Sequence, residues 1–136
     1  MQGSALHRYR DWGYLVLRLV VGIIFLYHGG QKWAFWAVAP AGMPSGFLLL
    51  FRLLSVVEPL AGLALIIGLC TQWAAFVLGI IMVGAIGMKI GLMHVPFASG
   101  ATTGWEFDLV LLAANLLLLL AGGGSLTIER KKAAGA

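Results

Sequence analysis

The sequence predicts an all-α membrane protein, built as a bundle of four transmembrane helices. Of its 136 residues, 61% are hydrophobic and only 10% are charged, and the mean hydropathy is +0.98. Soluble domains are about half apolar and about a quarter charged, so this composition excludes an ordinary soluble fold. A spanning helix takes about 20 residues, so we expect four spans with short loops and no separate soluble catalytic domain.

Four apolar stretches are long enough to cross a bilayer, and they run over residues 14–33, 47–69, 73–93 and 105–121. Backbone groups in lipid must be hydrogen-bonded within their own segment, so each stretch is expected to be helical. Turn-rich segments at 40–46, 70–72 and 95–104 separate the stretches. Residues 122–136 form the predicted cytoplasmic tail, and residues 1–136 are predicted to be a single domain.

Basic residues flank the apolar block, with Arg8 and Arg10 before it and three more at 130–132. The first and third loops carry no Lys or Arg, so the positive-inside rule predicts that both termini are cytoplasmic. The formal net charge of +4 therefore indicates anchoring at a membrane, and we expect no binding to nucleic acid. We interpret the first stretch as a span rather than a cleaved signal because it contains Arg18 and is longer than a typical signal core.

Charged and titratable side chains within or beside the spans are the candidate functional residues. An unpaired charge at the bilayer centre costs at least about 2.5 to 3.5 kcal/mol, so such groups face the bundle interior and pair. These residues are Arg18, His28, Lys32, Arg52, Glu58, Lys89, Glu106 and Asp108. Glu58 lies about 16 Å from the outer end of its span, near the midplane. We expect it to form an ion pair with Arg18 of the first span.

The other charged groups gather toward the half of the bundle that is distant from the termini. His28, Glu58 and Lys89 are the candidate catalytic residues, because histidine exchanges protons near neutral pH and buried carboxylates relay them. The candidate ligand-binding residues are Lys32, Arg52, Glu106, Asp108 and Asn115.

Simpler roles stay open for several of these residues. Glu106 follows Thr103 by three positions, which matches a helix capping box. The helix dipole favours Asp108 near a helix start, while Lys32 and Arg52 lie close enough to the interface to extend their charges into it.

Small residues and a proline indicate where helices pack and bend. Gly87 and Gly91 form a GxxxG motif that predicts close helix packing, and Gly84 continues the same surface. Pro59 follows Glu58, frees a backbone carbonyl one turn earlier and favours a kink that shapes a cavity. The sequence has one cysteine and lacks the spaced Cys and His residues of a metal centre. We therefore expect no metal site and no intrinsic cofactor.

Several short motifs occur in order along the chain: residues 18–25 with Gly29 and Lys32, then 58–62, 68–71 with Ala74 and Ala75, 104–109 and 122–126. Their order and spacing resemble the DoxX family of small four-helix membrane proteins, over about residues 14–129. The resemblance implies a four-helix bundle and marks Arg18, Lys32, Glu58, Glu106 and Asp108 as the family's polar residues. It also implies a link to membrane oxidoreductases, since some relatives are small subunits of quinone-reducing thiosulfate oxidoreductases and others are tied to oxidative stress.

Three functional hypotheses remain from the sequence, and it leaves open whether the protein is an enzyme. In the first, a membrane oxidoreductase subunit binds a quinone-like ring through Lys89, Lys32 or His28, Glu58 relays protons, and a redox partner protein supplies electrons. In the second, a proton-coupled transporter uses Glu58 as its coupling carboxylate and a homo-oligomer forms the pathway. In the third, the charges of a scaffold or assembly protein only hold the helices in register. We expect an integral protein of a bacterial inner membrane, in contact with membrane lipid.

Overall fold

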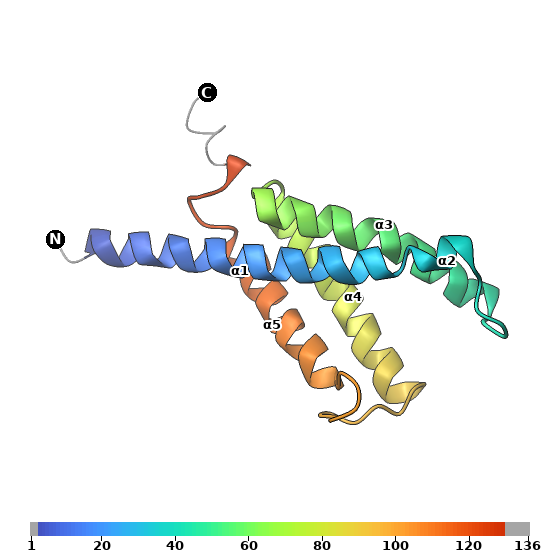
Figure 1. Cartoon of the computed structure of the whole chain (residues 1–136). Helices are drawn as coiled ribbons and strands as arrows, with labels where there is room; N and C mark the ends of the chain where they lie inside the picture. The colour runs from blue at the N-terminus through green and yellow to red at the C-terminus, as the bar shows by residue number, and fades with distance from the viewer. Residues whose placement is uncertain (1–2, 130–136) are drawn as a thin grey trace.

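The computed structural model describes residues 3–129, which form only helices, turns and loops. The helices are α1 (Gly3–Gln31), α2 (Ala34–Ala37), α3 (Ser45–Ile67), α4 (Thr71–Gly91) and α5 (Trp105–Ala121) (Figure 1). Three segments are long and apolar enough to cross a membrane: Tyr9–Ala37, Ser45–Ile67 and Thr71–Gly91. The 17 residues of α5 make a helix about 25 Å long, at the short end of the range for a span. The prediction of an all-α membrane protein is confirmed.

The first helix departs most from its predicted bounds of 14–33, because α1 begins at Gly3, eleven residues earlier, and ends at Gln31. α3 and α4 each begin and end two residues before the predicted limits, and α5 coincides with them. α3 ends early because Gly68 adopts a left-handed conformation with φ of 72°. The backbone N–H groups of Gly68 and Leu69 both donate to the Ala64 carbonyl at 2.9 Å, which closes the helix end. The chain then needs only Leu69 and Cys70 before α4 begins.

The long helices form two hairpins. α1 packs along α3 and α4 packs along α5, whereas contacts between the two pairs are sparser. Figure 1 shows α4 and α5 diverging from α1 and α3 toward the end that carries the loop between α4 and α5. The hairpins therefore meet at one end of the bundle and separate toward the other.

The first hairpin depends on glycines at the crossing of α1 and α3. A methyl group at Gly22 would lie 2.6 Å from the Gly62 carbonyl oxygen, and one at Gly62 would lie 2.7 Å from the Gly22 oxygen. About two helical turns further along α1, a methyl group at Gly29 would overlap the ring of Pro59. Only glycine permits this approach of the two backbones.

The GxxxG motif of α4 does not pack against another helix in the part of the chain that the structure describes. No atom there lies within 4 Å of a methyl group placed at Gly84, Gly87 or Gly91. The predicted packing role of these glycines is therefore wrong within this chain. The close small-residue contact belongs to α1 and α3 instead, because their glycines face each other at a crossing point.

Arg18 is buried at the junction of α1, α3 and the C-terminal segment, with only 1% of its side chain exposed. Its Nε donates to the Leu65 carbonyl at 2.8 Å, and Nη2 donates to the Ile66 carbonyl at 3.3 Å. Its Nη1 donates to the carbonyls of Gly123 at 2.8 Å and Leu126 at 3.0 Å. One guanidinium group therefore ties together three segments that are distant in sequence.

The predicted ion pair between Arg18 and Glu58 is wrong. The last carbonyls of α3 lack partners within the helix and carry the negative end of its dipole, so they attract the guanidinium. Glu58 lies about two turns, or about 10 Å, before Leu65 along α3. It pairs with Lys32 instead, at 2.6 Å.

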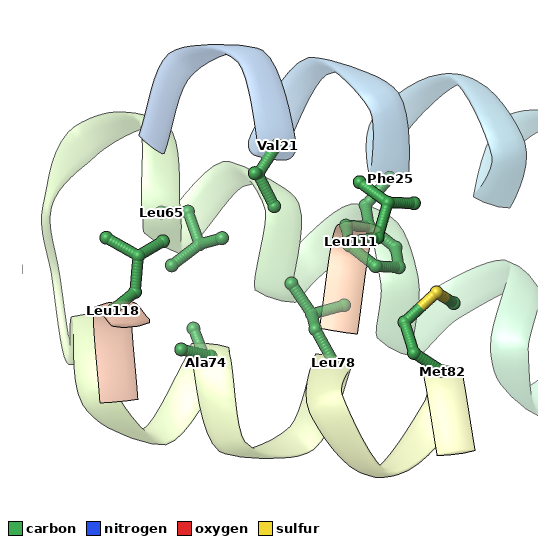
Figure 2. Close-up of a cluster of buried hydrophobic side chains, with 9 residues drawn as sticks. Val21, Phe25, Leu65, Ala74, Leu78, Met82, Leu111 and Leu118 are labelled. Carbon is green, nitrogen blue, oxygen red and sulfur yellow. The ribbon is translucent and has the colours of Figure 1, made fainter. Parts of the chain in front are cut away.

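A hydrophobic core joins the two hairpins next to Arg18. Figure 2 shows side chains from α1, α3, α4 and α5 pointing toward one another at this level. The buried core residues are Val21, Phe25, Leu65, Ala74, Ala75, Leu78, Met82, Leu111 and Leu118. Burial of a large apolar side chain stabilises a fold by about 1.5 to 3 kcal/mol in water, but in lipid the gain comes mainly from close packing.

Residues 122–129 are not a free tail. Thr127 is buried, the Glu129 N–H donates to the Gly68 carbonyl at 3.3 Å, and Asp11 binds the backbone and hydroxyl of Ser125. The second half of the predicted tail, 130–136, lies outside the described residues. The contact of Asp11 with Ser125 places both chain ends on one side, as an even number of spans requires. Their cytoplasmic location stays a prediction.

Replacing Arg18 with Met should release the C-terminal segment. The substitution keeps a long side chain but removes the Arg18 donor from the carbonyls of Ile66, Gly123 and Leu126, and each buried carbonyl left unsatisfied costs about 1 to 3 kcal/mol. Hydrogen–deuterium exchange in detergent should show faster exchange of amides 122–129, and the thermal midpoint should fall. Arg10→Met, at an exposed position, should change neither. Unchanged exchange at 122–129 in Arg18→Met would contradict this role.

Replacing Gly22 with Leu should push α1 away from α3, since the added side chain meets the Gly62 carbonyl. Overpacking of this kind costs about 1 to 3 kcal/mol, which should lower the thermal midpoint in detergent. Gly13→Leu is the matched control, because no described atom lies within 4 Å of a methyl group at that position of the same helix. Equal midpoints for the two variants would show that the helices are not in close contact at Gly22.

Candidate ligand-binding cavity

A cavity of about 770 Å³ lies between the two hairpins, on the side of the core that faces away from the termini. Phe25, Met82 and Leu111 belong both to the core and to the cavity lining, so the core forms its floor. Most of the lining is apolar, and the polar residues in it are His28, Lys32, Glu58, Lys89, Thr103 and Asp108. This volume falls in the range of about 300 to 1,000 Å³ found for small-molecule sites.

The first ion pair of the cavity connects the end of α1 to α3. Lys32 Nζ lies 2.6 Å from Glu58 Oε2, and the two side chains are 20% and 3% exposed. Lys32 also donates to the His28 carbonyl at 3.2 Å, at the C-terminal end of α1. These bonds use two of the three N–H groups of Lys32, so one is left for a ligand.

The second ion pair connects α4 to α5. Lys89 Nζ lies 2.6 Å from Asp108 Oδ2, and it donates to the carbonyls of Thr103 at 3.3 Å and Gly104 at 3.5 Å. Asp108 lies in the first turn of α5, where the helix dipole favours a carboxylate. Lys89 therefore holds the loop and the two helices together.

His28 lies between the two ion pairs. Its Nδ1 is 2.9 Å from the Ile24 carbonyl, which can only accept, so Nδ1 carries the proton and a neutral ring leaves Nε2 as an acceptor. The ring centroid lies 5.9 Å from that of Phe107, the neighbour of Asp108 on α5. His28, on α1, thus also contacts the second hairpin.

The cavity brings together five of the residues selected from the sequence: His28, Lys32, Glu58, Lys89 and Asp108. Two lysines and two carboxylates balance one another, so the polar lining carries no net charge when His28 is neutral. Such a site suits an uncharged group that both accepts and donates hydrogen bonds, because a net ionic charge would enter the apolar cavity without a counterion.

Arg52, Glu106 and Asn115 do not line the cavity in the described structure. Arg52 donates to the Phe35 carbonyl at 3.0 Å and lies 5.4 Å above the Trp36 ring. Asn115 is fully buried below the cavity floor, where its side-chain amide donates to the Leu111 carbonyl at 2.8 Å. This cavity therefore offers no ligand contact at these three predicted positions.

The predicted capping box at the start of α5 is wrong. Gly104 is the N-cap residue, and no side chain caps the helix. The backbone N–H of Glu106 donates instead to the Phe97 carbonyl at 3.1 Å. The loop folds back over the helix start, so the backbone supplies the partner that a Thr103 side chain would otherwise provide.

Sequence reasoning missed how the carbonyl freed by Pro59 is used. Trp33 Nε1 donates to the Ser55 carbonyl at 2.8 Å, and Trp36 Nε1 donates to the Ser55 hydroxyl at 2.8 Å. Trp33 therefore holds the α1–α2 turn against α3 beside the cavity. The signal was present in the sequence, because Pro59 marks Ser55 as the carbonyl without a helical partner.

The fold and the cavity together define a helical membrane protein with a mainly apolar pocket between its two hairpins, lined also by two ion pairs and a histidine. The family model of DoxX matches residues 13–95, and the chain belongs to this family. The matched region contains His28, Lys32, Glu58 and Lys89 and ends before Asp108. No curated protein and no solved structure matches the chain.

Lys32 and Glu58 should show strong energetic coupling. Either Lys32→Met or Glu58→Met leaves one buried charge without its partner, whereas the double variant removes both. The double variant should therefore lose less stability than the sum of the singles, by about 0.5 to 3 kcal/mol. Arg18→Met combined with Glu58→Met is the control and should be additive, because these side chains contact different groups. Additivity for Lys32 and Glu58 in denaturation experiments would rule out the pair.

Proposed function

We propose that this DoxX protein binds a quinone-like ring in the cavity and serves as an accessory subunit of a membrane oxidoreductase. The observation that carries the proposal is that two ion pairs and one histidine line an otherwise apolar cavity of about 770 Å³. Pockets of this kind combine apolar walls with a few polar groups that orient a ligand. A quinone ring, flat and uncharged with two carbonyl oxygens, matches both features.

Several side chains of the cavity have the groups that such a ring needs. The unused N–H of Lys32 is a donor for a ring oxygen, and the apolar lining accommodates the ring faces. Two-electron reduction of a quinone consumes two electrons and two protons. In this proposal a redox partner protein supplies the electrons and water supplies both protons. His28 Nε2, an acceptor in the neutral ring, takes up each proton in turn and passes it to a ring oxygen, while Glu58 holds Lys32 in its charged form beside the oxygen on which negative charge develops.

The transporter hypothesis has less support. Val21, Leu65, Leu78 and Leu118 are at most 2% exposed and fill the bundle between the cavity and the termini. The buried polar side chains at that level include Arg18, whose guanidinium donates to four backbone carbonyls. A fixed positive charge there opposes the passage of a proton through that layer.

The scaffold hypothesis draws support from one observation. Both ion pairs join helices within a hairpin, as a purely structural pair would do. However, ion pairs that only hold helices together do not need to line a cavity, as these two do. The charged pairs at the cavity wall, rather than in the closely packed core, favour a ligand site.

Native mass spectrometry of the gently purified protein should test the quinone hypothesis. We expect a bound isoprenoid quinone in the wild type and in Glu106→Gln, which alters a carboxylate outside the cavity. The Lys32→Met/Glu58→Met variant should lose it, because the polar end of the cavity is gone. Short-chain quinones should raise the thermal midpoint in the same pattern. If no quinone is bound and none shifts the midpoint of the wild type, the proposal fails.

A further inference from the structure

We infer that the cavity opens sideways into the lipid between α3 and α4, and that its ligand is an uncharged amphiphile with a single apolar tail that leaves through this opening. The inference rests on the proposed function for the nature of the polar head. The inference adds three points to the proposed function: how the ligand enters, where its apolar tail lies, and that charged lipids do not bind.

The gap between α3 and α4 follows from how the hairpins are joined. The two helices share buried contacts near their common turn, at Leu65, Ala75 and Leu78. Beyond that point they diverge, as Figure 1 shows. Leu50 of α3 and Ile80 of α4 line the cavity and yet are 42% and 56% exposed, so they lie at its edge.

Two glycines leave this edge open. Gly84 and Gly87 of α4 line the cavity, and within residues 3–129 no atom lies within 4 Å of a methyl group at either position. The sequence suggested that these glycines pack against another helix. In the structure they lie at the mouth of the cavity, which stays open because they have no side chains. On the opposite side of the bundle, between α1 and α5, the contact of His28 with Phe107 and the buried Phe25 close the wall.

The opening faces lipid rather than water. α3 and α4 both have the length and composition of membrane-spanning helices. Large apolar side chains flank the opening on the outer surface, with Leu53 on α3 and Val83 on α4 more than half exposed. A ligand dissolved in the bilayer therefore reaches the cavity without passing through water.

Charge and volume define the ligand class. The two lysines and two carboxylates already neutralise one another, so an ionised fatty acid or an acidic phospholipid would bring a charge without a counterion. Lys89 is directed at Asp108 and at the loop carbonyls, whereas Lys32 has an unused N–H group. The polar head therefore belongs at Lys32 and Glu58, on the side of α3. A cavity of about 770 Å³ holds a ring and the first part of a tail. The remainder of a long tail must extend through the opening.

Narrowing the opening should discriminate between ligands with and without a tail. Gly84→Leu and Gly87→Leu place side chains at the mouth, while Gly91→Leu adds the same group to α4 outside the cavity. Leucine favours helix more than glycine does, so all three variants should fold. The probes are a benzoquinone with a ten-carbon tail and the same ring without a tail, and binding is measured by quenching of tryptophan fluorescence.

We expect Gly84→Leu and Gly87→Leu to weaken binding of the tailed quinone about tenfold, or about 1.4 kcal/mol, and to leave the tailless ring nearly unaffected. Gly91→Leu should change neither. If both probes bind the wild type and the two mouth variants retain full affinity for the tailed one, the sideways opening is wrong while the proposed function stands. If neither probe binds the wild type, the proposed function fails and this inference with it. Palmitate binding that competes with the tailed quinone would overturn the exclusion of charged amphiphiles.

Discussion

The bonds from the Arg18 guanidinium to carbonyls of α3 and of the C-terminal segment determine how the rest of this bundle is arranged. A positive charge with 1% exposure is stable there because the free carbonyls at the end of α3 and those of Gly123 and Leu126 surround it. The C-terminal segment follows α5, so the same group also links the second hairpin to the first. This junction, together with the adjacent apolar core, holds the two hairpins at one end only.

The cavity is a consequence of that one-ended junction. Each hairpin is closed along its own length, by the Gly22–Gly62 crossing and the Lys32–Glu58 pair in the first, and by the Lys89–Asp108 pair in the second. Neither ion pair crosses from one hairpin to the other. Beyond the core, the link between the hairpins is the ring contact of His28 with Phe107. Space therefore remains between α3 and α4, where glycines rather than large side chains face it.

Lys32 and Lys89 lie at similar places in their hairpins but differ in their hydrogen-bond partners. Both follow or end the first helix of a hairpin and reach a carboxylate on the second helix. Lys89 also donates to the loop carbonyls of Thr103 and Gly104, whereas Lys32 donates to the His28 carbonyl and has one unused N–H group. Lys89 therefore has a structural role, whereas Lys32, which bonds the His28 carbonyl, has an N–H group that can bind a ligand.

The sequence by itself determined the membrane fold, the four apolar stretches and five of the eight residues selected for the site, because hydropathy and the high cost of charge in lipid act locally on each segment. Only the tertiary structure decided the partners. Arg18 binds the carbonyls at the end of α3 and does not pair with Glu58. Gly84 and Gly87 line a cavity and do not pack against another helix. Arg52, Glu106 and Asn115 lie away from the cavity. Such outcomes depend on how two hairpins meet across the bundle, which no local spacing specifies.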